Sequence, residues 1–234
     1  MTSSILIVDD ESSIRDMLRM ALESNGFNVD EASNAKLAQE KINQNTPDLL
    51  LLDWMMPGTS GVELVRRLRK EDSTRQLPII MLTAKDGDEH SIQALDTGAD
   101  DFITKPFSPK ALIARVKAML RRLDGSSDDF QQEQKIVSGD ITIDMVSHKA
   151  TVSDQTLELS PTEFRLLAFF SSHSGRVFSR NQLLNQVWGE SVYVEDRTVD
   201  VHIRRLRKIL ERYGVDQYIQ TVRGVGYRFD PAEA

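Results

Sequence analysis

Five polar side chains of the sequence stand at the ends of short aliphatic runs. They are, in chain order, Asp9, Asp10, Asp53, Thr83 and Lys105. If the runs form strands of one parallel sheet, these side chains reach the same edge, because the carboxyl ends of parallel strands meet there. Three carboxylates repel one another unless a cation lies among them, and Mg²⁺ suits carboxylate and carbonyl oxygens better than Zn²⁺ does. The set therefore predicts a magnesium site at this edge.

A carboxylate, a divalent cation, a hydroxyl and an ammonium group in one place are suited to phosphoryl transfer. The carboxylate acts as the nucleophile, while the other groups position the transferring group and neutralise its charge. Taken singly, an aspartate after a strand is more often a helix cap or turn former, and a lone lysine is usually solvated. The coincidence of all five residues favours a phosphoryl-transfer site.

Hydrophobic periodicity predicts the elements that must position these groups. Residues 1–123 alternate aliphatic runs with apolar residues at helical spacing, which is typical of a parallel sheet covered by helices on both faces. We therefore expect an α/β domain with a five-stranded, doubly wound parallel sheet. The clearest strands are Ile5–Val8, Leu49–Leu52, Pro78–Leu82 and Phe102–Thr104.

A change in composition divides the chain after residue 123. Residues 124–134 contain Asp, Gly, Ser, Gln and Glu with a single phenylalanine, so we expect a flexible linker there. Residues 135–234 then form a second, α+β domain with a small antiparallel sheet, three helices and a final hairpin. The expected elements are strands Ile141–Ile143 and Ala150–Val152, helices Thr162–Ser172, Arg180–Trp188 and Val199–Leu210, and the hairpin Ile219–Phe229.

Composition excludes several classes of protein. Of 234 residues, 40% are hydrophobic and 28% are charged, as in ordinary globular proteins. The lack of cysteine excludes disulfides, thiolate metal sites and a cysteine nucleophile. No aliphatic run approaches the roughly 20 residues of a membrane-spanning helix, and no basic and apolar leader opens the chain. We therefore expect a cytoplasmic protein.

The net charge of −7 is unevenly distributed. It amounts to −3 in residues 1–123, −4 in residues 124–133 and zero in residues 134–234. Residues 197–208 carry five arginine or lysine side chains and one acid, Asp200. Because phosphate binding depends on the local patch, a neutral domain with one basic face can still bind nucleic acid.

The basic segment is predicted to form an amphipathic helix. A helical wheel places Val199, Ile203, Leu206 and Leu210 on one apolar stripe. The opposite side carries Arg197, Thr198, Asp200, Val201, Arg204, Arg205 and Lys208. A charged helix face is more often simply solvated. However, an apolar Val201 within the basic side suits a thymine methyl group, and arginines beside it can bind phosphates or guanine edges, so we predict a DNA-binding helix.

Five motifs of the first domain resemble those of receiver domains in two-component response regulators of the OmpR/PhoB family. In order and spacing they are Asp9-Asp10, Asp53 to Gly58, Thr83-Ala84, Gly98 to Asp101 and Lys105-Pro106-Phe107. The resemblance implies a flavodoxin/CheY-like fold in which Asp53 accepts a phosphoryl group from a sensor histidine kinase. It implies that Thr83 and Lys105 bind phosphoryl oxygens and that the Lys105-Pro106 peptide bond is cis. The implied Mg²⁺ ligands are Asp9, Asp10, Asp53 and the carbonyl of Met55.

The family couples phosphorylation to dimerisation through a switch. The hydroxyl of Thr83 would reach toward the phosphoryl group, and an aromatic residue of the fifth strand would fill the vacated space. That residue is Phe102, where tyrosine is frequent in the family; a constant, half-buried Phe102 is the alternative. The active dimer would form through the fourth helix, fifth strand and fifth helix. Its implied contact residues are Asp100, Asp101, Arg115 and Lys117.

The second domain resembles the winged-helix effector domain of the same family. The matching segments are Thr162-Glu163-Phe164, Arg180 to Trp188, Val194 to Lys208 and Thr221 to Tyr227. The resemblance implies that Val201, Arg205 and Arg207 approach the major groove and that Arg223 on the wing enters the minor groove. The implied contacts to the DNA backbone are Arg197, Thr198, His202, Arg204, Trp188, Thr221 and Tyr227, although His202 could equally be a packed histidine. In part of the family, the sigma subunit of RNA polymerase is contacted by the region of Trp188, Val194, Glu195 and Asp196.

The leading hypothesis is a transcription regulator, not an enzyme, that is phosphorylated on Asp53, dimerises and binds tandem promoter repeats. The motif Asp53-Trp54-Met55 is most similar to members that control phosphate-starvation genes. A phosphatase or phosphotransferase is disfavoured because dehalogenase-type enzymes carry a second acid two residues after the nucleophile, where this chain has Met55. A phosphate-independent DNA-binding regulator is disfavoured because all five pocket residues are present.

Overall fold

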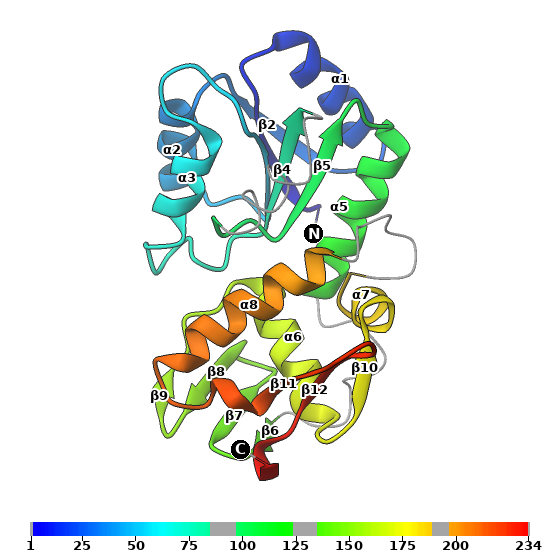
Figure 1. Ribbon diagram of the computed structural model, residues 1–234. Coiled ribbons are helices and arrows are strands. Elements are labelled where there is room, and N and C mark those ends of the chain that lie inside the picture. Colours follow the sequence, from blue (N-terminus) through cyan, green and yellow to red (C-terminus); the bar gives the residue numbers. More distant parts are fainter. Residues whose placement is uncertain (1, 85–96, 124–134, 189–196, 234) are drawn as a thin grey trace. The chain divides into compact units, whose positions relative to one another are not determined.

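The chain folds into two units, Met1–Asp124 and Gly125–Ala234, in a computed structural model that describes residues 2–84, 97–123, 135–188 and 197–233 (Figure 1). The expected linker, residues 124–134, lies outside the described residues, so its boundaries stay a prediction. None of the helices that the structure describes is long and apolar enough to cross a membrane.

The amino-terminal unit is built on a five-stranded sheet with the strand order β2-β1-β3-β4-β5. Every neighbouring pair is parallel, which confirms the predicted doubly wound sheet. The central strand β3 is buried along its whole length because helices cover both faces. The strands are β1 (Ser4–Val8), β2 (Asn28–Ala32), β3 (Leu49–Asp53), β4 (Ile79–Ala84) and β5 (Asp101–Lys105).

Among the described residues of this unit, two helices cover each face of the sheet. Helices α1 (Ser12–Glu23) and α5 (Pro109–Leu123) lie on one face, and α2 (Ala35–Gln44) and α3 (Gly61–Leu68) lie on the other (Figure 1). Leu18 of α1 and alternate residues of the strands form one continuous apolar cluster with α5. The helix expected between β4 and β5 falls on residues 85–96, which lie outside the described part of the chain.

The register of the sheet brings the predicted site residues to one edge. Strand β1 ends before Asp9, β3 ends at Asp53 and β5 ends at Lys105. Gly61 at the start of α3 lies very close to the end of β3. A Cβ atom on Gly61 would stand 2.1 Å from the carbonyl oxygen of Asp53. Only glycine allows this approach, so Gly61 helps to set the position of Asp53.

The carboxy-terminal unit combines two antiparallel sheets with three helices. One sheet has the order β6-β7-β8-β9 and the other β10-β12-β11, with the predicted hairpin formed by β11 and β12. The α+β prediction is therefore confirmed. The elements are β6 (Lys135–Ser138), β7 (Ile141–Asp144), β8 (Lys149–Val152), β9 (Gln155–Thr156), α6 (Pro161–Ser172), β10 (Val177–Ser179), α7 (Arg180–Trp188), α8 (Arg197–Glu211), β11 (Ile219–Val222) and β12 (Gly226–Phe229), with short 3₁₀ turns at Asp216–Tyr218 and Pro231–Glu233.

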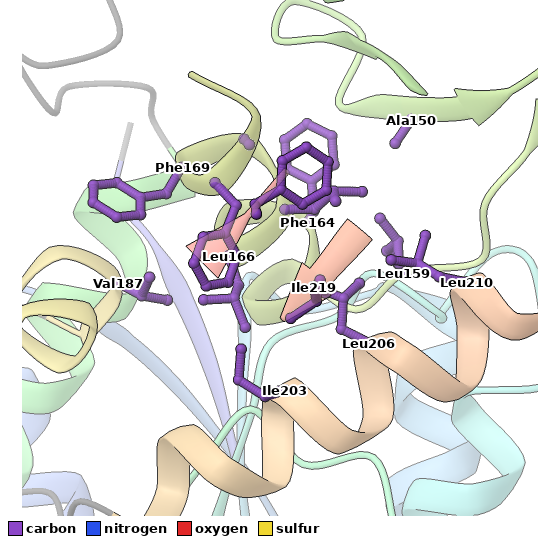
Figure 2. Packing of buried hydrophobic residues seen from close by; sticks show 14 of the residues in the cluster. Ala150, Leu159, Phe164, Leu166, Phe169, Val187, Ile203, Leu206, Leu210 and Ile219 are labelled. Atoms are coloured by element: carbon purple, nitrogen blue, oxygen red, sulfur yellow. The ribbon is translucent and has the colours of Figure 1, made fainter. Parts of the chain in front are cut away.

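The apolar stripe predicted for α8 packs into the core of this unit. Figure 2 shows Ile203, Leu206 and Leu210 pointing from one side of α8 toward the rest of the cluster, which includes Leu166 of α6 and Ile219 of β11. All three α8 side chains are buried, as is Val199 at the start of the stripe. This part of the helical wheel is confirmed.

The other side of α8 differs from the prediction. Val201 is only 6% exposed and Thr198 only 2%, so neither stands on an open basic face. His202 is fully buried, as in the packed alternative considered for it. The reason is that α8 has a second buried side, in which His202 faces Glu163 of α6. A wheel that counts apolar residues finds the first side and misses the second.

Gly226 permits a close approach between the paired strands β10 and β12, which allows a test of the packing. A Cβ atom there would stand 2.0 Å from the carbonyl oxygen of Phe178 in β10. We expect Gly226→Ala to lower the free energy of unfolding of this unit by about 3 kcal/mol, because β10 and β12 must move apart. Urea unfolding followed by Trp188 emission, in a chain with Trp54→Phe so that Trp188 is the only indole, measures this loss.

Gly224→Ala is the matched control for this variant. Its φ of +75° is unfavourable for alanine, but a Cβ atom would meet nothing within 4 Å. It should cost about 1 kcal/mol, and equal losses in the two variants would contradict the steric argument.

Candidate functional site

The edge of the parallel sheet holds two buried carboxylates and one ammonium group. The Nζ atom of Lys105 lies 2.8 Å from Oδ2 of Asp9 and 2.6 Å from Oδ1 of Asp53. The Asp9 side chain is fully buried, and that of Asp53 is 7% exposed. Two anions share one cation here, so the pocket keeps a net negative charge.

This charge distribution changes the proton affinities of the pocket. Burial raises the pKa of Asp53, and the neighbouring charge of Asp9 adds to the effect, against the opposing hydrogen bond from Lys105. Burial alone would lower the pKa of Lys105, but the two carboxylates outweigh it and hold that pKa above its usual value. The lysine therefore stays a cation, and Asp53 is a more basic carboxylate than a solvated one.

The loop that carries Asp9 and Asp10 is anchored by its own hydrogen bonds. Oδ1 of Asp9 accepts the backbone N–H of Glu11 at 2.9 Å. The guanidinium of Arg15 donates to the carbonyl oxygens of Asp9 and Asp10 at 2.8 and 3.1 Å, and it also pairs with Glu31. Sequence reasoning missed Arg15, which fixes this loop from one turn into α1.

The expected crowding of three carboxylates is not what the structure contains. Among the described residues, no three acidic or histidine side chains converge as a metal-binding group. Lys105 lies between Asp9 and Asp53, and Asp10, the third predicted carboxylate, is exposed to solvent.

The same edge nevertheless has the chemistry of a Mg²⁺ site. Its oxygen donors are hard, its net charge is negative, and the backbone of Met55 hydrogen-bonds the Asp53 carboxylate. The residues present therefore fit such an ion.

The two predicted switch residues lie on neighbouring strands. Thr83 is buried in β4 and pairs in register with Thr104 of β5. Phe102 is 7% exposed, so its ring is buried rather than half-buried. The Lys105-Pro106 bond is cis, which confirms that prediction.

The acids predicted for a dimer face are engaged within the unit. Asp100 is fully buried, and its Oδ2 atom receives Arg69 at 2.7 Å and the backbone N–H of Ile79. Asp100 was expected on the surface, but it is buried because it forms an ion pair with Arg69 at the carboxyl end of α3. Asp101 pairs with Arg115 at 2.9 Å. Lys117 donates to Asn25 at 2.8 Å beside α1.

In the carboxy-terminal unit, two arginines of α8 have defined partners. Nη2 of Arg205 lies 2.8 Å from Oε1 of the buried Glu163, and its side chain is 14% exposed. Arg207 donates to the carbonyl oxygen of Ile219 and to Oγ1 of Thr221, which joins α8 to β11. Arg204 is exposed. Arg205 and Arg207 are therefore each bonded to groups outside α8.

A second polar cluster joins α7, α8 and the hairpin. Oδ1 of Asp200 accepts Nε of Arg180 and the hydroxyl of Tyr227, both at 2.7 Å. Burial, together with Asp200, raises the pKa of Tyr227, so the phenol keeps its proton at neutral pH. The wheel placed Asp200 on the open face, and no sequence signal linked it to residues 20 and 27 positions away.

Four of the residues predicted to contact the DNA backbone are buried, namely Trp188, Thr198, His202 and Tyr227. Within the described ranges, Nε1 of Trp188 and Oγ1 of Thr198 have no hydrogen-bond partner. Arg223 is exposed between β11 and β12, where the prediction placed the wing tip. Arg197 begins α8, whereas Val194, Glu195 and Asp196, predicted to meet polymerase, lie outside the described residues.

Comparison with known proteins identifies both units. Residues 5–117 match the response regulator receiver domain, and residues 154–229 match the family described as transcriptional regulatory protein, C terminal. The chain is 55% identical over 227 residues to the phosphate regulon transcriptional regulatory protein PhoB of Pseudomonas aeruginosa, covering 97% of this chain and 96% of the relative. It is 52% identical over 229 residues to that of Escherichia coli K12, covering 98% of each. A solved structure of a RitR mutant matches with a TM-score of 0.78 and 27% identity over 97% of this chain and 99% of that one.

The chain joins a receiver fold with an acidic pocket to a DNA-binding winged-helix domain. This combination defines a response regulator, which is a transcription regulator controlled by phosphorylation. The chain belongs to the OmpR/PhoB family of these proteins.

The shared cation of the receiver pocket can be tested by its removal. We expect Lys105→Met to lower the free energy of unfolding of the receiver by roughly 2 kcal/mol at pH 7.5 in EDTA, because two buried carboxylates lose their counter-ion. Solvent screens this interaction in part, because Lys105 is 19% exposed, so the loss is smaller than for a fully buried pair. Urea unfolding followed by Trp54 emission, in a chain with Trp188→Phe, measures the loss.

The loss should shrink as the pH falls. Folding raises the pKa of Asp53 above the value in the unfolded chain. The folded protein is therefore less stable at a pH where Asp53 is ionised, and it regains this stability as the pH falls and Asp53 is protonated. Adding Asp53→Asn to Lys105→Met should restore part of the stability. An unchanged midpoint in Lys105→Met would contradict the shared-cation interpretation.

Proposed function

We propose that this response regulator accepts a phosphoryl group on Asp53 from a sensor histidine kinase, then dimerises and binds repeated promoter sites. The observation that carries the proposal is the buried pair of Asp9 and Asp53 at one Lys105 ammonium group. The proposed targets are phosphate-starvation genes, because relatives 52 and 55% identical over nearly the whole chain are phosphate regulon regulators. The proposed location is the cytoplasm, where bacterial promoters are found.

Each group of the pocket has a task in this reaction. A carboxylate oxygen of Asp53 forms the new bond to phosphorus as the bond to the donor breaks. The ammonium of Lys105 and the hydroxyl of Thr83 would then contact phosphoryl oxygens. Mg²⁺ would supply positive charge against the transferring group when bound. Its proposed ligands are Asp9, Asp10, Asp53 and the carbonyl of Met55.

The phosphoryl signal would pass along β4 and β5. Thr83 would move toward the new oxygens, and the ring of Phe102, on the neighbouring strand, would adjust to the space behind it. The proposed dimer uses the face of the fourth helix, β5 and α5, where Asp101 and Arg115 already lie together. Asp100 would support this face from inside through Arg69.

The proposed DNA contacts are made by α8 and the hairpin. Nε1 of Trp188 and Oγ1 of Thr198 are buried donors without a partner in the described part of the chain, and they are proposed to bind phosphate oxygens after a local movement exposes them. Arg205 and Arg207 would approach the major groove and Arg223 the minor groove. Further backbone contacts are proposed for Arg197, His202, Arg204, Thr221 and Tyr227, and a sigma-subunit contact for the region of Trp188 and residues 194–196.

Two alternatives are less well supported. A phosphotransferase of the dehalogenase type would carry a second acid two residues after Asp53, where this chain has the exposed Met55. A phosphate-independent regulator would have no need of a buried, negatively charged pocket. The pocket therefore favours control by phosphorylation.

Phosphorylation can be tested directly on the full chain. Acetyl phosphate with Mg²⁺ should add one acid-stable, base-labile phosphoryl group, because Asp53 is the proposed acceptor. Asp53→Asn should abolish this addition, measured by intact-mass spectrometry, and EDTA should abolish it in the unaltered chain. Asp16→Asn, an exposed change in α1, is the control and should label normally. Full labelling of Asp53→Asn would move the acceptor elsewhere.

The wing contact can be tested by Arg223→Ala. Loss of one phosphate-attracted cation should raise the dissociation constant for the footprinted promoter duplex about tenfold and reduce the salt slope by about 1. Electrophoretic mobility shifts over a salt series measure both quantities. Arg212→Ala, another exposed arginine of this unit, is the control. If Arg223→Ala and the control bound alike, the wing would not enter the minor groove.

A further inference from the structure

Glu163 is a buried acid to which the proposed function assigns no task. It lies in the first turn of α6 and is 1% exposed. Its Oε1 atom lies 2.8 Å from Nη2 of Arg205 and 3.3 Å from Nδ1 of His202. Burial alone would raise the pKa of Glu163, but the charge of Arg205 and the hydrogen bond with His202 hold it well below its usual range. A permanent anion therefore lies beneath the DNA-binding helix.

The two oxygens of Glu163 have separate roles. Oε2 accepts the backbone N–H of Ser160 at 2.9 Å, which completes the start of α6. Oε1 instead faces α8, where it contacts His202, a residue 39 positions after Glu163 in the sequence. Capping α6 requires only the first oxygen. The second joins α6 to the polar side of α8.

Arg205 is restrained by this contact before any DNA is present. Its guanidinium is a planar fork of five N–H donors, so fixing one nitrogen fixes the directions of the others. A solvated arginine loses up to about 2 kcal/mol of rotamer entropy when it is ordered. At Arg205, which is 14% exposed, much of this ordering exists in the folded protein.

We propose that Glu163 is a positioning residue for sequence recognition, which holds Arg205 in the orientation that contacts the edge of a base. The expected target is a guanine, whose O6 and N7 atoms accept two parallel N–H bonds from an arginine. This inference rests on the proposed placement of α8 in the major groove. Glu163 itself does not contact DNA.

The positioning role has a consequence that a purely structural role lacks. Without the carboxylate, Arg205 remains a cation but loses its fixed direction, so it can still attract phosphates of any sequence. Discrimination between sequences should fall, while affinity for arbitrary duplexes should stay equal or increase. General destabilisation would weaken both kinds of binding together.

The test uses the full chain and a pool of randomised duplexes. The unaltered protein, treated with acetyl phosphate and Mg²⁺, selects an enriched duplex, and a shuffled duplex of the same composition serves as the non-specific probe. Glu163→Gln keeps an oxygen for the Ser160 N–H and removes the charge. We expect it to reduce the ratio of the two affinities about tenfold, with no loss of affinity for the shuffled duplex. Glu211→Gln, an exposed change on α8, is the matched control and should keep the ratio.

Two further variants show whether the effect passes through Arg205. In an Arg205→Ala background, Glu163→Gln should cause no additional loss of discrimination. Arg205→Lys, which keeps Glu163 and a positive charge but lacks the planar fork, should lose discrimination as well, and it provides the test if Glu163→Gln does not fold.

The contrary results are distinct. An unchanged ratio in Glu163→Gln, parallel weakening of both duplexes, or a further loss in the Arg205→Ala background would overturn the positioning role alone. If Glu163→Gln did not fold, full discrimination by Arg205→Lys would overturn it. Failure of the unaltered chain to enrich any duplex would overturn both this inference and the proposed DNA contacts.

Discussion

Asp9 and Asp53 share one ammonium group at the edge of a buried sheet, and the rest of the receiver positions these three charges. Two carboxylates with a single cation are not neutral, so burial and mutual repulsion raise the free energy of the pocket as long as it carries its excess charge. The parallel register of the strands brings Asp9, Asp53 and Lys105 to one edge of the sheet. The cis Lys105-Pro106 bond precedes the turn that follows β5. Gly61 allows α3 to approach the carbonyl oxygen of Asp53. In the proposed reaction, a bound Mg²⁺ would offset the excess, and a phosphoryl group would change the charge of Asp53 itself. Cation binding and phosphorylation would therefore both act on a pocket that already carries excess negative charge.

The effector domain uses the same kind of interaction for a different purpose. Glu163 and Asp200 are acids that hold arginines of neighbouring elements, Arg205 and Arg180 respectively. Apolar packing of Leu206 and its neighbours settles how deeply α8 lies in the core, but apolar contacts have little directional preference. The ion pairs and hydrogen bonds supply that direction, because they have preferred lengths and angles. The orientation of α8, the helix proposed to bind DNA, thus depends on polar groups from α6, α7 and the hairpin.

Sequence patterns predicted the elements whose apolar residues are buried in a regular pattern along the chain. β3 is buried on both faces, so its leucine run was recognisable, whereas β2 at the sheet edge alternates exposed and half-buried residues and has no aliphatic run. In the site, residue types at strand ends predicted the meeting of Asp9, Asp53 and Lys105. The inward turn of Asp100 was not predictable in this way, because it depends on Arg69, 31 residues earlier. Likewise, burial of Val201 and His202 follows from a second packed side of α8, which no periodicity within that helix reveals.

The internal pairing of Asp101 with Arg115 constrains how a phosphorylated dimer gains stability. The two side chains already bond each other at 2.9 Å within one chain. A dimer that used them across its interface would exchange one ion pair for another, so ion pairing would add little to association. The stability of the proposed dimer would then come from apolar surface and from the proposed rearrangement near Thr83 and Phe102. A coupling free energy of about 1–3 kcal/mol between two sites changes an association constant by roughly 5- to 150-fold. That range would suit reversible control, because the proposed dimer would then form in response to phosphorylation and separate when the phosphoryl group is lost.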